Sequence, residues 1–290
     1  MKAIDSILVA VDPGVNARAA IAKAATLARG FGARLELFQC DAERAFALHH
    51  QYEARDAERA REAARAESRA YLERLWRSLA VPDVQVGINA ACESPLYAGV
   101  VREVCRSASS LVLRAIGGVD AHREGVLSAS DWELVRTCPV PLLLTRGRPW
   151  HADPAVAAAI DIVAEEAPEL THRILRAASQ FATTCGARLE ILHGAPLCDA
   201  ARENTLRTAL AACAAEAGVH VAQVHVLGGD PAAVLPAFAA RRGYDLLVLG
   251  ALTHRKALTA LVGSLTGQLL ETLDCDFLLV KPREYRSPVH

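Results

Sequence analysis

The chain has 290 residues, of which 52% are hydrophobic and 22% charged, and its formal net charge is −1. This length fits about two globular domains, and a charge so close to zero provides no overall field that would attract nucleic acid or an anionic membrane. No apolar stretch reaches the roughly 18 residues that a bilayer-spanning helix needs. The amino-terminal residues lead into a strand-like segment without a secretory signal, so we expect a cytoplasmic protein with no nucleic-acid or membrane partner.

The second half of the sequence repeats the first. Residues 32–37 read GARLEL and residues 186–191 read GARLEI. Further features recur in the same order on both sides of this match, such as Ser94-Pro95 and Asp230-Pro231. A linker with glycine and two prolines separates the copies. We therefore predict two domains of one kind, residues 1–147 and 153–290.

In the first repeat, short apolar runs alternate with helical patterns, which predicts a parallel sheet. The predicted strands are Ser6–Val11, Arg34–Cys40, Asp83–Asn89, Ser110–Arg114 and Pro141–Thr145. A helix is expected over Ala17–Phe31, because its apolar residues recur three or four positions apart, and Gly32 suits the left-handed end of that helix.

The segment from Asp41 to Leu79 is rich in alanine, glutamate and arginine. Its helix propensity is high, and Glu73 and Arg77 have the spacing of a helical ion pair. This pattern predicts a long solvated helix, and a partner-binding helix is the alternative. Further on, Asp131 and its neighbours after Ser130 predict another helix start, because acidic residues are favoured near the positive end of the helix dipole.

The second repeat shows the same alternation, with a helix over Thr171–Cys185 that ends at Gly186. Its predicted strands are Val156–Asp161, Arg188–His193, Val219–Leu227, Asp245–Leu249 and Phe277–Lys281. The predicted fold class is therefore α/β, with two tandem, doubly wound, Rossmann-like domains that each contain a five-stranded parallel sheet.

The residues that follow the strand ending at Gly250 have the pattern of an anion site. A glycine after a strand lets the backbone approach a ligand closely. Gly263 and Ser264 then open a helix, whose unpaired N–H groups and positive dipole end suit a phosphate. Ser264 and Thr266 add hydroxyl groups, and residues 254–256 make the intervening loop basic. We expect this segment to bind the phosphates of a nucleotide.

The segment resembles the universal stress protein family, whose nucleotide-binding members carry G-x-x-G, nine residues and then G-[S/T] after a buried strand. Gly250 matches the first glycine and Gly263 the closing one, whereas Thr253 replaces the middle glycine, where its Cβ would hinder close approach to phosphates. The resemblance also implies that Asp12 and Asp161, at the ends of the first strands, occupy the position that contacts the nucleoside. The nucleotide-binding residues that it implies are Asp161, Gly250, Thr253, Gly263, Ser264, Leu265 and Thr266.

The resemblance implies a cytoplasmic stress-response protein that binds ATP, another adenine nucleotide or a small ligand without turning it over. The sequence contains neither a P-loop nor a dinucleotide fingerprint, and the motif contains no acidic metal ligand, so we predict no metal and no enzymatic activity. Two alternatives stay open, a slow ATPase or phosphoryl-transfer enzyme and a ligand-free interaction scaffold.

The first repeat matches this motif less well. At an offset of 136 residues, Arg114 and Leu127 fall on Gly250 and Gly263, so we expect this repeat not to bind a nucleotide in the family's way. Single-domain members of the family dimerise, typically through the last strand. The resemblance therefore implies intramolecular pairing of the two repeats, with residues 141–145 and 277–281 near the contact, and a homodimer of the whole chain is also open.

Overall fold

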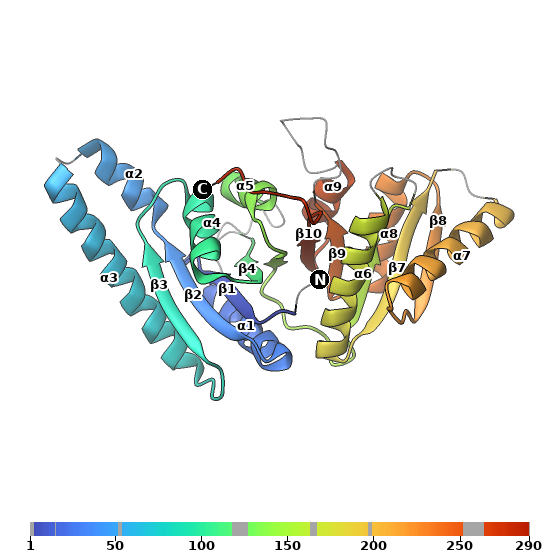
Figure 1. Ribbon diagram of the computed structural model, residues 1–290, viewed down its shortest axis with the longest axis horizontal. Coiled ribbons are helices and arrows are strands. Elements are labelled where there is room, and N and C mark those ends of the chain that lie inside the picture. The colour runs from blue at the N-terminus through green and yellow to red at the C-terminus, as the bar shows by residue number, and fades with distance from the viewer. Residues whose placement is uncertain are drawn as a thin grey trace. The chain divides into compact units, whose positions relative to one another are not determined.

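The structure, a computed structural model, describes residues 3–14, 16–51, 54–117, 127–162, 167–196, 199–251 and 264–289. It divides into two compact units (Figure 1). The first unit comprises Lys2–Arg148 with Arg286–His290, and the second unit comprises Pro149–Tyr285. Among the described residues, no helix is both long enough and apolar enough to cross a membrane.

The described part of the first unit contains five parallel strands in the order β3-β2-β1-β4-β5. The strands are β1 (Ser6–Ala10), β2 (Arg34–Cys40), β3 (Val86–Ala91), β4 (Leu111–Ala115) and β5 (Leu142–Thr145). The helices are α1 (Ala17–Phe31), α2 (Ala42–Gln51), α3 (Ala54–Leu79), α4 (Leu96–Ser107) and α5 (Ala129–Thr137).

The second unit has the same topology, with parallel strands in the order β8-β7-β6-β9-β10. The strands are β6 (Ala155–Ala159), β7 (Arg188–Ala195), β8 (Gln223–Gly228), β9 (Leu246–Gly250) and β10 (Asp276–Val280). The helices are α6 (Ala167–Cys185), α7 (Ala200–Glu216), α8 (Pro231–Arg242) and α9 (Ser264–Thr272).

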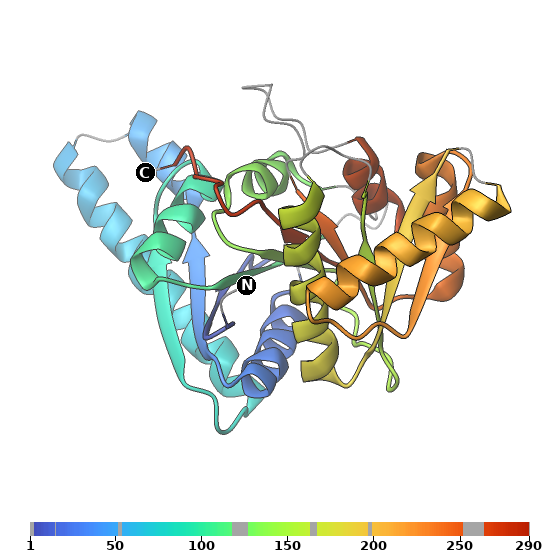
Figure 2. The ribbon, with the colours of Figure 1, turned by 45° about the vertical axis from the view of Figure 1, so that its right-hand side comes forward.

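Helices pack on both faces of each sheet. In the first unit α1 contacts α3 while α4 contacts α5, and in the second unit α6 contacts α7 while α8 contacts α9 (Figure 2). Strands β1, β4 and β10 are buried along their whole length. Strands that are covered on both faces require a continuous apolar sequence. The short apolar runs from which the strands were predicted meet this requirement. The predicted doubly wound α/β fold is confirmed.

The charged segment after β2 forms two helices, so the prediction of one helix over Asp41–Leu79 is wrong. The second helix, α3, ends at Leu79 as predicted and carries the expected ion pair, with Arg77 Nη2 2.9 Å from Glu73 Oε2. Helix α2 packs against α3 through a small apolar cluster. That cluster contains Ala45, Leu48, Ala60, Ala64 and Cys92. Burial of these side chains stabilises the folded-back arrangement, which helix propensity alone does not reveal.

Several other element boundaries also differ from the prediction. Strand β3 begins at Val86 rather than Asp83, and β8 begins at Gln223 rather than Val219. Helix α5 begins earlier than expected, because Ser128 is its N-cap rather than Ser130. The Ser128 hydroxyl accepts a hydrogen bond from the Asp131 amide at 3.1 Å, and the Asp131 carboxylate accepts one from the Ser128 amide at 3.0 Å. This reciprocal capping box fixes the start of α5.

The two glycines expected to end helices do so. Gly32 follows α1 with φ 66°, and Gly186 follows α6 with φ 63°, both in the left-handed region. The next residue closes each helix end in the same way, since the Ala33 amide donates to Ala28 O and the Ala187 amide to Ala182 O, each at 2.8 Å. The repeated GAR sequence therefore encodes the same helix stop and strand entry in both units.

Backbone hydrogen bonds show which residues of the two units are equivalent. The Ile116 amide donates to Thr145 O at 2.9 Å, and the Ala251 amide donates to Val280 O at 2.8 Å, at the same place in each sheet. Ile116 thus corresponds to Ala251, which is an offset of 135 residues. The same offset relates α5 to α9, where Cys138 and Leu273 make the equivalent amide bonds to Leu134 O and Leu269 O.

The offset of 136 suggested by the sequence is therefore wrong by one residue in these elements. Arg114 corresponds to Leu249, and Gly250 corresponds to Ala115. Successive strand residues point to opposite faces of a sheet, so the slip of one residue exchanges the faces. Compared with the second unit, the first unit therefore has an arginine in place of the buried Leu249, not in place of Gly250.

Candidate functional site

The predicted site lies at the carboxyl edge of the second sheet, where β6 and β9 end side by side. Parallel strands in such folds place ligands at this edge. Asp161 follows β6 and is exposed, whereas Ile160 before it is buried and its amide donates to Leu192 O at 2.9 Å. The strand thus anchors the backbone up to Ile160 and presents the Asp161 carboxylate beyond it.

A buried histidine supports this strand end. The side chain of His193, on β7, is almost fully buried, and its Nδ1 lies 2.8 Å from Ile160 O. Because a carbonyl oxygen only accepts hydrogen bonds, Nδ1 carries the proton and donates it. Sequence reasoning did not single out His193; the available signal was a polar residue at the end of an otherwise apolar strand. Its role is to position the residue that precedes Asp161.

Gly250 ends β9 against helix α6. A Cβ added to Gly250 would lie 3.0 Å from Leu170 Cδ2 and 3.4 Å from Ile174 Cδ1. These are the ends of flexible side chains, and the equivalent Ala115 carries a Cβ in the first unit. The close packing of α6 therefore favours glycine at this position, because a Cβ at residue 250 would point toward α6.

The first turn of α9 meets the end of β9. Helix α9 begins at Ser264, and Leu265 and Thr266 are partly buried. The Thr266 hydroxyl donates to Gly250 O at 3.3 Å, so this predicted phosphate donor is directed at the strand. Two other predicted site residues, Thr253 and Gly263, lie outside the described residues. The structure thus brings Gly250 and Thr266 into contact and places Asp161 at the same edge of the sheet.

The same edge of the first unit is filled by an arginine. The Arg114 side chain is 5% exposed, and its guanidinium reaches two carboxylates from different elements. Nη2 lies 3.0 Å from Asp12 Oδ2, and Nε lies 3.1 Å from Asp131 Oδ1. Arg114 Nη1 also lies 3.4 Å from Ala10 O. These bonds connect the ends of β1 and β4 to the first turn of α5.

The second unit has no counterpart of this arginine at the equivalent position. Leu249 is the residue equivalent to Arg114 and is buried, and Thr266 is the residue equivalent to Asp131. Asp12 and Asp161 are equivalent, since each lies one residue after the amide that bonds to β2 or β7. The two equivalent aspartates therefore have different surroundings, because β4 supplies a cation to Asp12 and β9 supplies a leucine at that place.

A second polar cluster lies nearer the amino end of β7. The buried Glu190 carboxylate accepts hydrogen bonds from Tyr244 Oη at 2.6 Å, Arg242 Nη2 at 2.5 Å and His225 Nε2 at 2.8 Å. Burial raises the pKa of Glu190, but these donors outweigh it and hold the pKa below its ordinary value. Burial and the Glu190 carboxylate raise the pKa of Tyr244. This cluster links β7, β8 and the end of α8, away from the edge that carries Asp161.

Within the described part of the chain, no group of three or more His, Cys, Asp or Glu side chains could hold a metal ion. What the described residues at the edge of the second sheet offer is an exposed carboxylate and the start of a helix. A carboxylate accepts hydrogen bonds from hydroxyl groups, and a helix start favours anions.

A model of the universal stress protein family matches residues 155–281. The protein named Universal stress protein E of Escherichia coli K12 is 21% identical, and the similarity covers 100% of this chain and 98% of that protein. A protein of the same name from Photorhabdus laumondii is 20% identical and covers 98% and 97%.

Two solved structures share the fold across both units. One is a Pseudomonas aeruginosa PAO1 protein described as functionally unknown, with TM-score 0.74, 23% identity, and coverage of 97% of this chain and 93% of that one. The other is a universal stress protein from Archaeoglobus fulgidus DSM 4304, with TM-score 0.72, 14% identity, and coverage of 96% and 98%. At these identities the likeness concerns the fold alone.

Proposed function

Because the chain belongs to the universal stress protein family, in its tandem form, we propose that it is a cytoplasmic, non-catalytic stress-response protein that binds ATP or another adenine nucleotide in its second unit. The first unit then serves as a structural partner. At its equivalent edge, the Arg114 side chain already binds the Asp12 carboxylate.

The contrast between Asp12 and Asp161 carries this proposal. Asp12 is held by Arg114 at 3.0 Å, whereas Asp161 is exposed beside a strand that carries Leu249. A carboxylate that accepts the two hydroxyl donors of a ribose gains charge-assisted hydrogen bonds. The start of α9 at the same edge supports the phosphate end, because its N–H groups and dipole favour an anion.

Calorimetric titration with ATP tests the proposal on the full chain. We expect Asp161→Asn to weaken binding by roughly tenfold, because hydrogen bonds to a charged group contribute about 1.5–3 kcal/mol. The matched control is Asp12→Asn, which changes the equivalent carboxylate of the first unit and should leave ATP affinity within about twofold of wild type. Equal weakening by both variants, or by neither, would contradict an assignment to the second unit.

The same preparation separates the two alternatives. Gly263→Val places a side chain at the predicted start of α9 and should abolish ATP binding if the helix start holds the phosphates. Magnesium-dependent release of phosphate by wild type would favour a slow ATPase or phosphoryl-transfer enzyme. Absence of ATP binding by both wild type and Gly263→Val would favour a ligand-free scaffold.

We also propose that the two repeats pair with each other through β5 and β10, as single-domain relatives pair in a dimer. The support is the duplication itself, since a fused copy can supply the partner that a single domain finds in a second chain. A disulfide formed between cysteines introduced at Thr145 and Val280 would support the pairing, and sedimentation equilibrium distinguishes a monomeric chain from a homodimer.

A further inference from the structure

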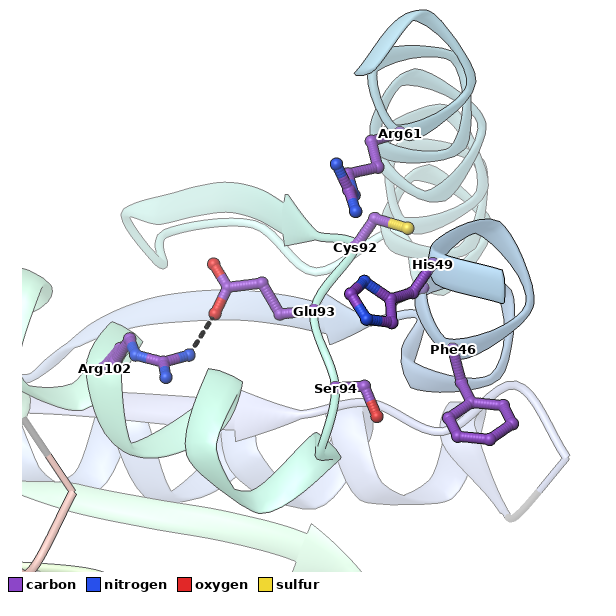
Figure 3. Close-up of a pocket in the computed structure, with 8 residues that line it drawn as sticks. Phe46, His49, Arg61, Cys92, Glu93, Ser94 and Arg102 are labelled. Atoms are coloured by element: carbon purple, nitrogen blue, oxygen red, sulfur yellow. Dashed lines mark hydrogen bonds and ion pairs between the residues drawn. The ribbon is translucent and has the colours of Figure 1, made fainter. Parts of the chain in front are cut away.

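The first unit contains a cleft that involves neither the Arg114 network nor any residue of the predicted nucleotide site. It lies between α2, α3 and the connection from β3 to α4, and its volume is about 580 Å³ (Figure 3). This volume is within the range of small-molecule sites, about 300–1,000 Å³. The residues that line it are Ala45, Phe46, His49, Arg61, Cys92, Glu93, Ser94 and Arg102.

The cleft depends on a segment that only the first unit has. Two helices, α2 and α3, connect β2 to β3, whereas the single described helix α7 connects β7 to β8. On the other wall, the Ala98 amide bonds to Pro95 O as the Ala233 amide bonds to Asp230 O, so Arg102 corresponds to Ala237. Glycines 228 and 229 stand in place of Glu93 before α8. The described part of the second unit therefore lacks both the additional helix and the charged side chains that form this cleft.

One side of the cleft offers aromatic rings. Phe46 is 60% exposed and is the one exposed large hydrophobic side chain in the described part of the chain. His49 follows it by three residues on α2, which places both on the same face of that helix. Figure 3 shows the His49 ring extending from α2 toward the segment that carries Cys92, Glu93 and Ser94, with Phe46 on the same helix. The buried Cys92 and Ala45 form an apolar floor, so an aromatic ring has favourable surroundings here.

The opposite side of the cleft carries Arg61, whose ion pair with Glu58 is long. Arg61 Nη1 lies 3.5 Å from Glu58 Oε2, whereas Arg65 Nη2 lies 2.9 Å from Glu58 Oε1. The other arginine of the cleft, Arg102, lies 2.5 Å from the Glu93 carboxylate. Of the two guanidinium groups that line the cleft, Arg61 is therefore the one that an incoming anion can engage without breaking a close ion pair.

We propose that this cleft binds a small organic anion that contains an aromatic ring, with the ring against Phe46 and His49 and the anionic group at Arg61. The site is separate from the nucleotide site of the second unit. The first unit, whose family site is filled by its own arginine, thereby has a binding site of a different chemistry.

Fluorescence titration with 8-anilinonaphthalene-1-sulfonate, an aromatic anion, tests the proposal on the full chain. We expect one site per chain, weakened about tenfold by Arg61→Gln and about three- to tenfold by Phe46→Ala. Arg65→Gln is the matched control, because Arg65 shares Glu58 with Arg61 but does not line the cleft. It should change the affinity by less than about twofold.

A neutral relative of the dye, N-phenyl-1-naphthylamine, isolates the role of the charge, because its binding should be insensitive to Arg61→Gln. Circular dichroism establishes that each variant is folded. Equal effects of Arg61→Gln and Arg65→Gln, or unchanged binding in folded Phe46→Ala, would overturn the proposal. Asp161→Asn should bind the dye like wild type, so failure of the nucleotide proposal leaves this result unaffected.

Discussion

Replacement of Arg114 by leucine gives the first unit the residue that the second unit has at the equivalent position. The change removes a guanidinium that is 5% exposed from two carboxylates, of which Asp131 is 8% and Asp12 32% exposed. Loss of one partner of a buried ion pair costs about 3–5 kcal/mol. Two factors reduce this cost. Asp131 keeps its hydrogen bonds from the amide and hydroxyl of Ser128. Burial of the introduced leucine side chain also contributes hydrophobic stabilisation.

We therefore expect Arg114→Leu to lower the free energy of unfolding of the first unit by about 2–3 kcal/mol. Urea unfolding of the full chain, followed by fluorescence and circular dichroism, measures the effect. Two of the three tryptophans, Trp76 and Trp132, lie in the first unit. With a denaturant slope of about 1–3 kcal/mol per molar, the midpoint of that unit's transition should fall by roughly 1 M or more.

A double-mutant cycle tests the reasoning more sharply. Asp131→Thr introduces the residue equivalent to Thr266, and the double variant reproduces the pair found in the second unit. If the Arg114–Asp131 contact stabilises the unit, the two changes should couple by at least about 1 kcal/mol. Additivity of the two single changes within about 0.5 kcal/mol would refute the account of this network.

Two further predictions concern the second unit. Because the pKa of Glu190 is lowered on folding, its stabilising effect is present above its ordinary pKa of about 4.5 and is lost as the pH falls through the lower folded pKa. Glu190→Gln should cost about 1–3 kcal/mol at pH 7 and reduce the loss of stability on acidification, measured by urea unfolding at pH 7 and at about pH 3; an unchanged pH dependence would contradict this. Gly194→Ala should cost about 1–3 kcal/mol, because its Cβ would lie 2.8 Å from Pro231 Cβ and 3.1 Å from Pro231 Cα. Gly250→Ala, which meets the flexible end of a leucine, should cost less, and the opposite order of midpoints would show that these contacts do not decide the effect.

The sequence was sufficient for the architecture. Apolar runs separated by helical patterns predicted each of the strands that the structure describes, and strand β2 was predicted with its observed bounds, Arg34–Cys40. Gly32 and Gly186 were recognised as helix ends because few residues tolerate a positive φ. These features are local, since each depends on residues that are near in the chain, and a single sequence therefore displays them.

The folded-back pair α2 and α3 depended on contacts that the sequence pattern does not display. An alanine-rich charged segment has high helix propensity throughout, so the pattern predicts one long helix. The packing of Leu48 and Ala45 against α3 decides in favour of two. The cleft of the first unit exists only because of this arrangement, and its residues 46, 61 and 102 are far apart in the chain.

The equivalence of the two candidate sites likewise required the tertiary structure. Strands such as LVLRA and LLVLG align almost equally well at offsets of 135 and 136, because one buried aliphatic residue resembles the next. Hydrogen bonds between neighbouring strands remove that ambiguity, since a slip of one residue exchanges the faces of the sheet. Sequence determined that two copies of one fold are present. Strand register decided that Arg114 faces Asp12 and Asp131 in the first unit, and that Leu249 stands at the equivalent position of the second unit.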